Sequence, residues 1–142
     1  METPPILQIL NQTQAMLQGD HFVYSSGKHG DVYINKNDLF AFTRACCSAG
    51  KLMAESFAGS DIDTVAGPAM CGVLPAQWTA FHLSNLQNKE IYSVFAERDS
   101  AAPFVFKRGY DKFIAGKNVL IVDDIANSGG TLKKFVQVVK AA

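Results

Sequence analysis

The stretch NVLIVDDIANSGGT, residues 118–131, decides the fold class of this sequence. It begins with the apolar run Val119–Val122, and an unbroken apolar run is typical of a central parallel strand, which is buried on both faces. Asp123 and Asp124 follow directly, and a segment rich in Ser, Gly and Thr comes next. One interpretation is a buried strand that ends in an ordinary turn. The other is a site that binds a ribose and its phosphate.

The loop after the two aspartates has the composition of a phosphate-binding loop. Ligands of open parallel sheets bind beyond the carboxyl ends of the strands, where the N-terminal amides of the following helix also point. Glycines let the backbone wrap closely around an anion, and hydroxyl groups add hydrogen-bond donors. The candidate loop consists of Ala126, Asn127, Ser128, Gly129, Gly130 and Thr131.

The two aspartates need another partner, because they would repel a phosphate that touched them. Carboxylates accept hydrogen bonds from neighbouring sugar hydroxyls and coordinate hard cations. Asp123 and Asp124 are therefore candidates for binding a ribose. The combination of strand, acidic pair, glycine loop and amphipathic helix favours this site over an ordinary turn. The GxxxxGK and GxGxxG motifs of other nucleotide-binding sites are absent from the sequence.

Helical and strand patterns alternate along the rest of the chain. Helices are predicted at 6–17, 42–57, 73–86 and 131–140. Strands are predicted at two places within 21–40 and at 62–67, 91–96 and 118–124, and a loop at 99–116. In the third helix Trp78, Phe81 and Leu86 mark the helical pattern, and Trp78 is expected in the core. The alternation predicts an α/β fold with a parallel sheet flanked by helices.

The composition argues against several classes of protein. The chain has 142 residues, which suits one domain. Its 13 basic residues balance 13 acidic ones, so neither a nucleic acid nor a membrane is expected as a partner. The cysteines, Cys46, Cys47 and Cys71, do not have the spacing of a disulfide framework or a metal site. Without a signal-peptide pattern or a membrane-spanning apolar run, the protein is expected to be soluble and cytoplasmic.

The stretch VLIVDDIANSGGT resembles the phosphoribosyl-pyrophosphate binding motif of the type I phosphoribosyltransferases. Three further stretches resemble the orotate phosphoribosyltransferases in particular: HFVYSSGKHGDVYIN at 21–35, GPAMCGVLPA at 67–76 and VFAERDSAAPFVFKRGYDKFIAGK at 94–117. The first of them discriminates most, because other branches of the superfamily lack it. The resemblance implies a Rossmann-like type I phosphoribosyltransferase fold in a single domain, 1–142, with an N-terminal hood at 1–40 and a parallel-sheet core at 41–142.

The resemblance also implies roles for individual residues. Asp123 and Asp124 would be the catalytic residues that hold the ribose hydroxyls, and the loop from Ala126 to Thr131 would cradle the 5-phosphate. Ala69 and Met70 would lie against the pyrophosphate. The remaining candidates for substrate binding are basic residues: Arg98 in a mobile loop that closes over the site, Lys107 and Arg108 for the same task, and Lys28 in the SGKHG segment.

The reaction implied is the transfer of the phosphoribosyl group from phosphoribosyl pyrophosphate to orotate, with Mg²⁺ as cofactor and no metal ligand assigned among the side chains. The products would be orotidine 5′-monophosphate and pyrophosphate. Two alternatives stay open: a phosphoribosyltransferase for a purine or another base, and a non-catalytic sensor of the same fold. A homodimer is implied. Because the sequence ends inside a predicted helix, either the sheet is small or the chain is truncated.

The histidines and one cysteine have competing interpretations. His29 lies in a glycine-rich turn, where it either faces the base or is an ordinary solvated turn residue. His21 and His82 are interpreted as structural. Cys71 lies beside the Gly-Pro-Ala loop and is expected to be a small buried thiol, not a nucleophile.

Overall fold

The computed structural model describes residues 3–24 and 26–142. The chain forms two compact units, Met1–Ala49 and Gly50–Ala142, and the boundary falls within helix α3, Thr43–Ser56. Among the described residues, no helix has the length and apolar character needed to cross a membrane. Whether the two units act as the single domain expected from the sequence stays a prediction.

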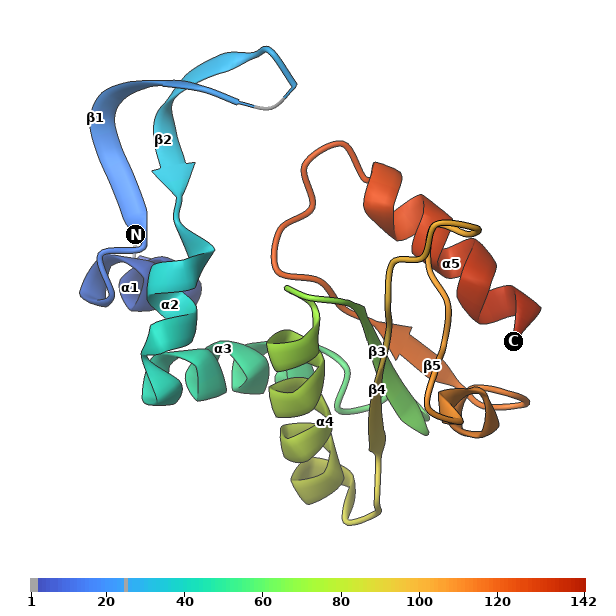
Figure 1. The fold of residues 1–142 in the computed structure, drawn as a ribbon. Coiled ribbons are helices and arrows are strands. Elements are labelled where there is room, and N and C mark those ends of the chain that lie inside the picture. The colour runs from blue at the N-terminus through green and yellow to red at the C-terminus, as the bar shows by residue number, and fades with distance from the viewer. Residues whose placement is uncertain (1–2, 25) are drawn as a thin grey trace. The chain divides into compact units, whose positions relative to one another are not determined.

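The N-terminal unit contains two short helices and a hairpin (Figure 1). Its elements are α1, Pro5–Gln12; β1, Met16–Val23; β2, His29–Ile34; and α2, Lys36–Ala41. The two strands pair antiparallel, with a shift of register between Gln18 and Phe22. A small core of Leu10, Ala15 and Leu39 holds the unit together. The predicted strand–turn–strand pattern is confirmed, although β1 begins before residue 21.

The prediction that the first helix extends to residue 17 is wrong. The helix ends at Gln12. The hydroxyl of the next residue, Thr13, donates a hydrogen bond to the carbonyl oxygen of Ile9 at 3.0 Å. Gln14 then has a φ of 54°, a left-handed conformation that an α-helix does not continue through. Leu17 lies in β1 opposite Tyr33, so its helical spacing from Leu10 was coincidental.

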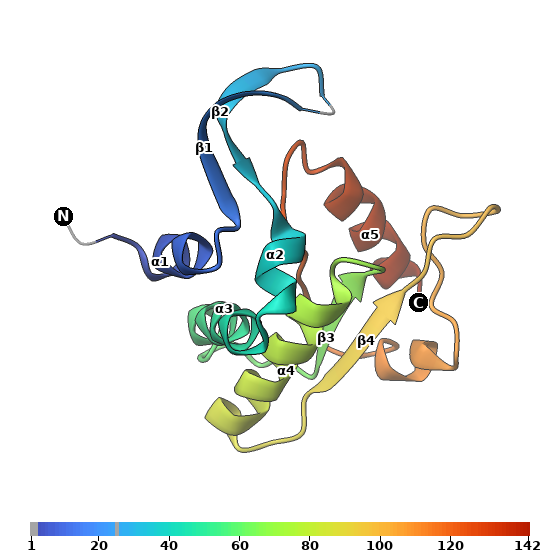
Figure 2. The same ribbon diagram turned by 60° about the vertical axis from the view of Figure 1, so that its left-hand side comes forward.

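The C-terminal unit is built on a parallel sheet of three strands in the order β4-β3-β5. The strands are β3, Thr64–Pro68; β4, Tyr92–Ala96; and β5, Val119–Ile121. The helices are α4, Val73–Gln87, and α5, Gly130–Ala141, with a short 3₁₀ helix, η1, at Tyr110–Phe113. Figure 2 shows β3 and β4 running side by side with α4 and α5 beside them, and β5 is labelled in Figure 1. The predicted parallel α/β architecture is confirmed.

The central strand β3 is buried along its whole length and divides the core in two. Val65 packs with apolar residues of α3 and α4, including Ala54 and Leu83. The next residue, Ala66, packs with Phe104 and Phe135. Successive side chains of a strand point to opposite faces, so the two clusters cover opposite faces of the sheet. This burial explains why the strand sequences near the site contain almost no polar residues.

The predicted helix at 73–86 is confirmed as α4, but the expectation that Trp78 lies in the core is wrong. Phe81 is 49% exposed and Leu86 50% exposed, and Trp78 is only half-buried. The buried residues of the helix are mostly small: Pro75, Ala76, Thr79, Ala80 and Leu83. Close packing of α4 on α3 needs small groups, because a Cβ atom at Gly50 would collide with the Cβ atom of Trp78. Phe81 and Leu86 therefore lie outside this closely packed face, and Trp78 is only partly covered.

Replacing Phe135 by alanine should strongly destabilise the C-terminal unit. The side chain is fully buried, with its ring 5.2 Å from Phe104 and 6.0 Å from Phe106. Phe→Ala changes in such cores cost about 3–5 kcal/mol. Thermal unfolding followed by circular dichroism should show a large drop in Tm, whereas Phe57→Ala, at a site 38% exposed, should change it little. Equal melting of the two variants would contradict this core assignment.

Candidate functional site

The carboxyl ends of the three parallel strands bring most of the predicted site residues to one edge of the sheet. Asp123 and Asp124 follow β5, Ala69 and Met70 follow β3, and Arg98 follows β4. The strand ends are in register, since Pro68 pairs with Ala96 and the N–H of Ala69 donates to the carbonyl oxygen of Ala96 at 2.9 Å. Ligands of open α/β sheets bind at this edge.

The segment after β3 folds back tightly on itself. The N–H of Gly72 donates to the carbonyl oxygen of Pro68 at 2.9 Å, and a Cβ atom at Gly67 would collide with the carbonyl group of Gly72. The peptide bond between Ala69 and Met70 is cis, and the Met70 side chain is 83% exposed. A Cβ atom at Gly72 would in turn collide with Pro68, so both Gly67 and Gly72 are required to be glycine. Cys71 is half-buried and not fully buried as expected.

The two aspartates are fixed by the backbone that follows them. One carboxylate oxygen of Asp123 accepts a hydrogen bond from the N–H of Asp124 at 2.9 Å. One carboxylate oxygen of Asp124 accepts from the N–H of Ile125 at 2.7 Å. Both residues are half-buried, and the second oxygen of Asp124 is inaccessible to solvent. The chain therefore places two negative charges, in defined orientations, directly at the end of β5.

The predicted phosphate loop ends at the first turn of α5. Gly129 has a φ of 74°, which only glycine adopts readily, and no side chain caps the helix. The N–H of Gly130 faces the hydroxyl of Ser128 at 3.4 Å. The first amides of a helix have no partner within the helix, and the helix dipole favours an anion beside them. The exposed residues 126–128 lead into this helix start, so the loop suits a phosphate.

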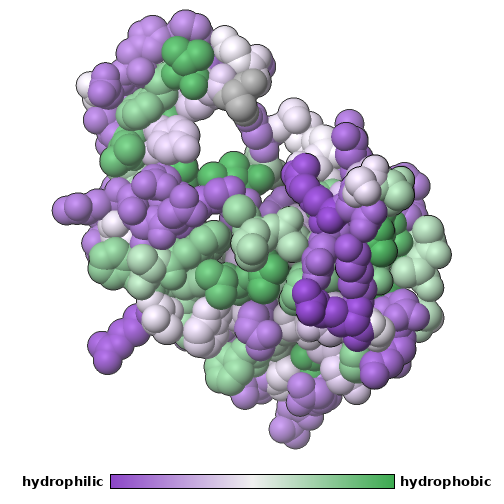
Figure 3. All heavy atoms as spheres, viewed as in Figure 1, coloured by the Kyte–Doolittle hydropathy of each residue, from purple (hydrophilic) through white to green (hydrophobic). Residues whose placement is uncertain are grey.

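The loop predicted at 99–116 is partly ordered by its own charges. Glu97 and Val105 form an antiparallel bridge through two backbone hydrogen bonds, and η1 follows. Lys107 Nζ lies 2.9 Å from Asp99, and Arg108 binds Glu97 at 2.7 Å. Hydrophilic residues gather over this connection between β4 and β5 in Figure 3. The two acidic partners, Glu97 and Asp99, were missed from the sequence, because the order of acidic, apolar and basic residues along 97–108 does not by itself fix which side chains pair.

Arg98 is placed differently from the other two basic candidates. Its guanidinium carbon lies 5.5 Å from the centre of the Phe104 ring, a cation–π arrangement on a buried aromatic side chain. Arg98 lies two residues after the end of β4, at the same edge as the acidic pair, whereas Lys107 and Arg108 are engaged with carboxylates of their own loop. Pyrophosphate binding by all three residues stays a prediction.

Lys28 lies in the N-terminal unit, in the turn of the β1–β2 hairpin. The N–H of Tyr24 donates to the Lys28 carbonyl oxygen at 2.9 Å, which closes the turn. Its side chain belongs to a different unit from the residues at the sheet edge. Substrate binding by Lys28 therefore stays a prediction.

A metal ion could be held at the sheet edge only with help from a ligand. Within residues 3–24 and 26–142, no group of three or more His, Cys, Asp or Glu side chains could hold a metal. Asp123 and Asp124 offer hard oxygen donors, and Mg²⁺ is commonly bound by one or two carboxylates together with substrate phosphates and water. The donor set therefore fits Mg²⁺ that arrives with a phosphorylated substrate.

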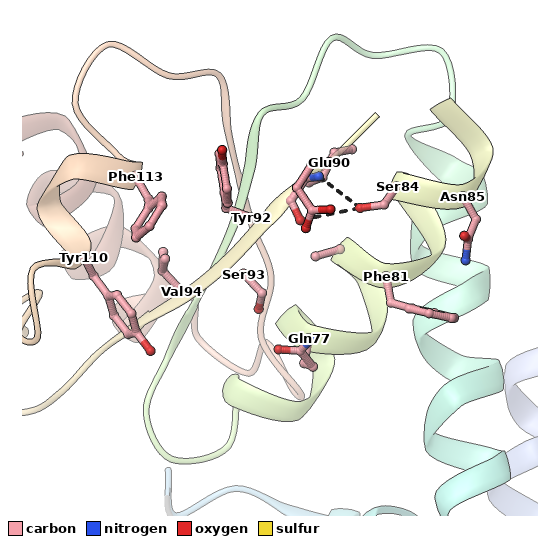
Figure 4. A pocket seen from close by; sticks show the side chains of 12 residues that line it. Gln77, Phe81, Ser84, Asn85, Glu90, Tyr92, Ser93, Val94, Tyr110 and Phe113 are labelled. Carbon is pink, nitrogen blue, oxygen red and sulfur yellow. Dashed lines mark hydrogen bonds between the residues drawn. The ribbon is translucent and has the colours of Figure 1, made fainter. Parts of the chain in front are cut away.

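A groove elsewhere on the C-terminal unit does not belong to this site. It has a volume of about 470 Å³ and lies between α4, the edge strand β4 and η1. Figure 4 shows Tyr110 and Phe113 on one side of it and Gln77 and Ser84 on the other. Ser84 accepts a hydrogen bond from the N–H of Ile91 at 3.0 Å, which ties the helix to the start of β4. None of the predicted site residues lines this groove.

The pairing of Lys107 with Asp99 should make the 97–108 hairpin sensitive to pH. Hydrogen bonds from the Ala101 N–H and then from Lys107 lower the pKa of Asp99, and Asp99 raises the pKa of Lys107. The pairing is thus complete at neutral pH, and is lost in acid as Asp99 protonates and in strong alkali as Lys107 deprotonates.

Asp99→Asn should speed hydrogen exchange of the Val105 amide, measured by NMR at neutral pH, because that amide forms the bridge to Glu97. In the wild type, exchange of the Val105 amide should also become faster in acid as Asp99 protonates, and this additional change should be absent from the variant. Asp111→Asn, in η1, serves as the control and should leave Val105 unchanged. Identical exchange in all three proteins would show that the ion pair does not order the hairpin.

Comparison with known proteins agrees with the geometry of the sheet edge. The family model described as phosphoribosyl transferase domain matches residues 48–142. The chain is 30% identical over 141 residues to the orotate phosphoribosyltransferase of Caldanaerobacter subterraneus subsp. tengcongensis, covering 99% of this chain and 70% of the relative. It is 34% identical over 136 residues to that of Thermotoga maritima, covering 95% and 67%.

Solved structures share the fold at lower sequence identity. Orotate phosphoribosyltransferase of Mycobacterium tuberculosis H37Rv superposes with a TM-score of 0.69 at 19% identity, over 97% of this chain and 77% of that one. An adenine phosphoribosyltransferase gives a TM-score of 0.63 at 20% identity, over 94% and 81%. On the family model and the sequence identity to curated relatives, the chain belongs to the phosphoribosyltransferase family, in its orotate phosphoribosyltransferase branch.

Proposed function

We propose that the protein transfers the 5-phosphoribosyl group of phosphoribosyl pyrophosphate to orotate, giving orotidine 5′-monophosphate and pyrophosphate in pyrimidine biosynthesis. The observation that supports this most strongly is the position of the acidic pair. Asp123 and Asp124 stand between the end of β5 and an uncapped helix start, and the tight backbone turn after β3 lies at the same sheet edge. Each part of the sugar phosphate thus has a chemically suitable neighbour.

The 5-phosphate would bind at the start of α5. Backbone N–H groups of the first helical turn and the hydroxyls of Ser128 and Thr131 are the donors available to it. The other loop residues would offer only their backbone groups to the phosphate: Ala126, Asn127, Gly129 and Gly130. The left-handed φ of Gly129 curves the loop. A phosphate held here would be bound mainly by backbone groups, with two short hydroxyl side chains beside them.

The acidic pair would bind the ribose hydroxyls and stabilise the charge that develops on the ring. When the bond between the anomeric carbon and pyrophosphate breaks, positive charge spreads over the ribose ring. Fixed carboxylates close to this charge stabilise the transition state more than the ground state. The base provides the attacking nitrogen, so the mechanism needs no nucleophilic side chain from the protein.

The departing pyrophosphate would lie beside the turn of Ala69 and Met70, with Arg98 close to it. Lys107 and Arg108 could join only by exchanging their present carboxylate partners for phosphate oxygens. Mg²⁺, held by the phosphates with Asp123 or Asp124, would neutralise charge on the leaving group. Lys28 of the hairpin, a homodimeric state and a cytoplasmic location belong to the same proposal, on the strength of the resemblance.

A panel of bases tests the proposed specificity. Protein, Mg²⁺ and phosphoribosyl pyrophosphate are mixed with orotate, adenine, guanine or hypoxanthine, and loss of each base is followed by chromatography. Orotate alone should be consumed, with formation of its nucleotide. Consumption of a purine but not orotate would assign the chain to another specificity. Binding of phosphoribosyl pyrophosphate without turnover of any base would make it a sensor.

Asp124→Asn should lower kcat by about 10²- to 10³-fold, the range found when a single group that stabilises transition-state charge is removed. Asparagine keeps the size of the side chain but removes the negative charge that opposes the ring cation. Turnover of orotate and thermal unfolding are measured on the same preparations, with Asp111→Asn as the matched control. Full activity of Asp124→Asn would contradict the role given to this residue.

A further inference from the structure

The β1–β2 hairpin places two histidines in direct contact. The Nε2 atom of His21 lies 2.6 Å from the Nδ1 atom of His29, and the ring centres are 4.8 Å apart. His29 pairs with Val23 across the hairpin, and His21 precedes Val23 by two residues. Residues two apart in a strand share a face, so the two rings meet on one face as diagonal cross-strand neighbours.

The surroundings of this pair favour a cation. The two rings line a hollow of about 580 Å³ together with Gly19, Asp20, Gly30 and Asp31. Gly19 leaves open space in the hollow, whereas the Tyr24 ring fills the space beside Gly30, and the acidic residues Asp20 and Asp31 complete the lining. One oxygen of Asp20 accepts a hydrogen bond from the N–H of His21 at 2.7 Å, which fixes the backbone that presents the ring. Both histidine side chains are exposed, so an ion could reach them from solvent.

We propose that His21 and His29 bind a divalent transition-metal ion such as Zn²⁺ or Cu²⁺ through these two facing nitrogens. Imidazole nitrogen is a preferred ligand of such ions, whereas Mg²⁺ prefers oxygen donors, so the Mg²⁺ of the proposed reaction would not compete. No third His, Cys, Asp or Glu joins them in a metal-binding group within the described residues. Water completes the coordination, and the site is open.

Binding requires two small adjustments. Zinc–nitrogen distances of about 2.0–2.1 Å in a tetrahedral site put the two nitrogens about 3.3 Å apart, so the rings must separate slightly from their present 2.6 Å. Rotation of exposed side chains provides this. Both facing nitrogens must also be unprotonated. The ring that now donates the shared hydrogen must therefore move its proton to its opposite nitrogen, leaving Nδ1–H on His21 and Nε2–H on His29.

Calorimetric titration of the full chain with Zn²⁺, in buffer containing millimolar Mg²⁺, tests the site without any activity assay. One equivalent should bind to the wild type. His21→Gln and His29→Gln should each weaken that binding by about 10- to 100-fold or more, since loss even of outer-sphere support has an effect of this size. His82→Gln is the matched control, because His82 is the third histidine and lies in the other unit; its affinity should equal that of the wild type.

A second measurement separates this site from binding by cysteine. NMR of the histidine rings should show the tautomers named above in the zinc-bound protein, and a chelator should reverse the change. Zn²⁺ binding that survives in the His21→Gln, His29→Gln double variant would belong to the thiols and overturn the proposal. Failure of the wild type to bind would show that the two rings serve only as a hydrogen bond across the hairpin, and would leave the proposed transferase function intact.

Discussion

The complete burial of one strand, β3, is the constraint on which the C-terminal unit depends. Its neighbours β4 and β5 both pair with it, and its side chains anchor both apolar clusters. A polar side chain buried in such a strand needs a hydrogen-bond partner. The hydroxyl of Thr64 accordingly donates to the carbonyl oxygen of Phe113 at 2.6 Å. Because all three strands are parallel, their carboxyl ends meet at one edge of the sheet, and the candidate site residues that follow the strands lie there.

Much of this arrangement could be predicted from the sequence, for physical reasons. A parallel central strand has an apolar sequence without alternation, and Val119–Val122 shows it; glycine and hydroxyl residues after such a strand have few structural explanations other than a tight loop. The helices at α3, α4 and α5 were found because their apolar residues repeat at helical spacing. The edge of the sheet that holds the site follows from the parallel topology alone.

The errors have a physical cause as well. Helical spacing cannot show that Leu17 belongs to a strand, because the break at Gln14 depends on a left-handed backbone conformation that glutamine seldom adopts. The expected burial of Trp78 is wrong because helical spacing does not show which residues of α4 pack closely on α3, and the buried face consists mostly of small residues such as alanine and threonine. The carboxylate partners of Lys107 and Arg108 depend on a hairpin pairing that no periodicity reveals. Side-chain partnerships formed by folding are not encoded in local patterns.

The tight approach of Gly67 to Gly72 has a consequence for how specificity can change in such a protein. Where one main chain presses against another, a side chain cannot be added without displacing the backbone, and in the proposed function the surface offered to pyrophosphate consists largely of peptide groups, which do not change with the surrounding side chains. Selectivity for one heterocycle over another must then reside in other parts of the molecule, whose side chains can vary without disturbing this surface. One scaffold can therefore serve enzymes that share a sugar-phosphate donor and differ in its acceptor.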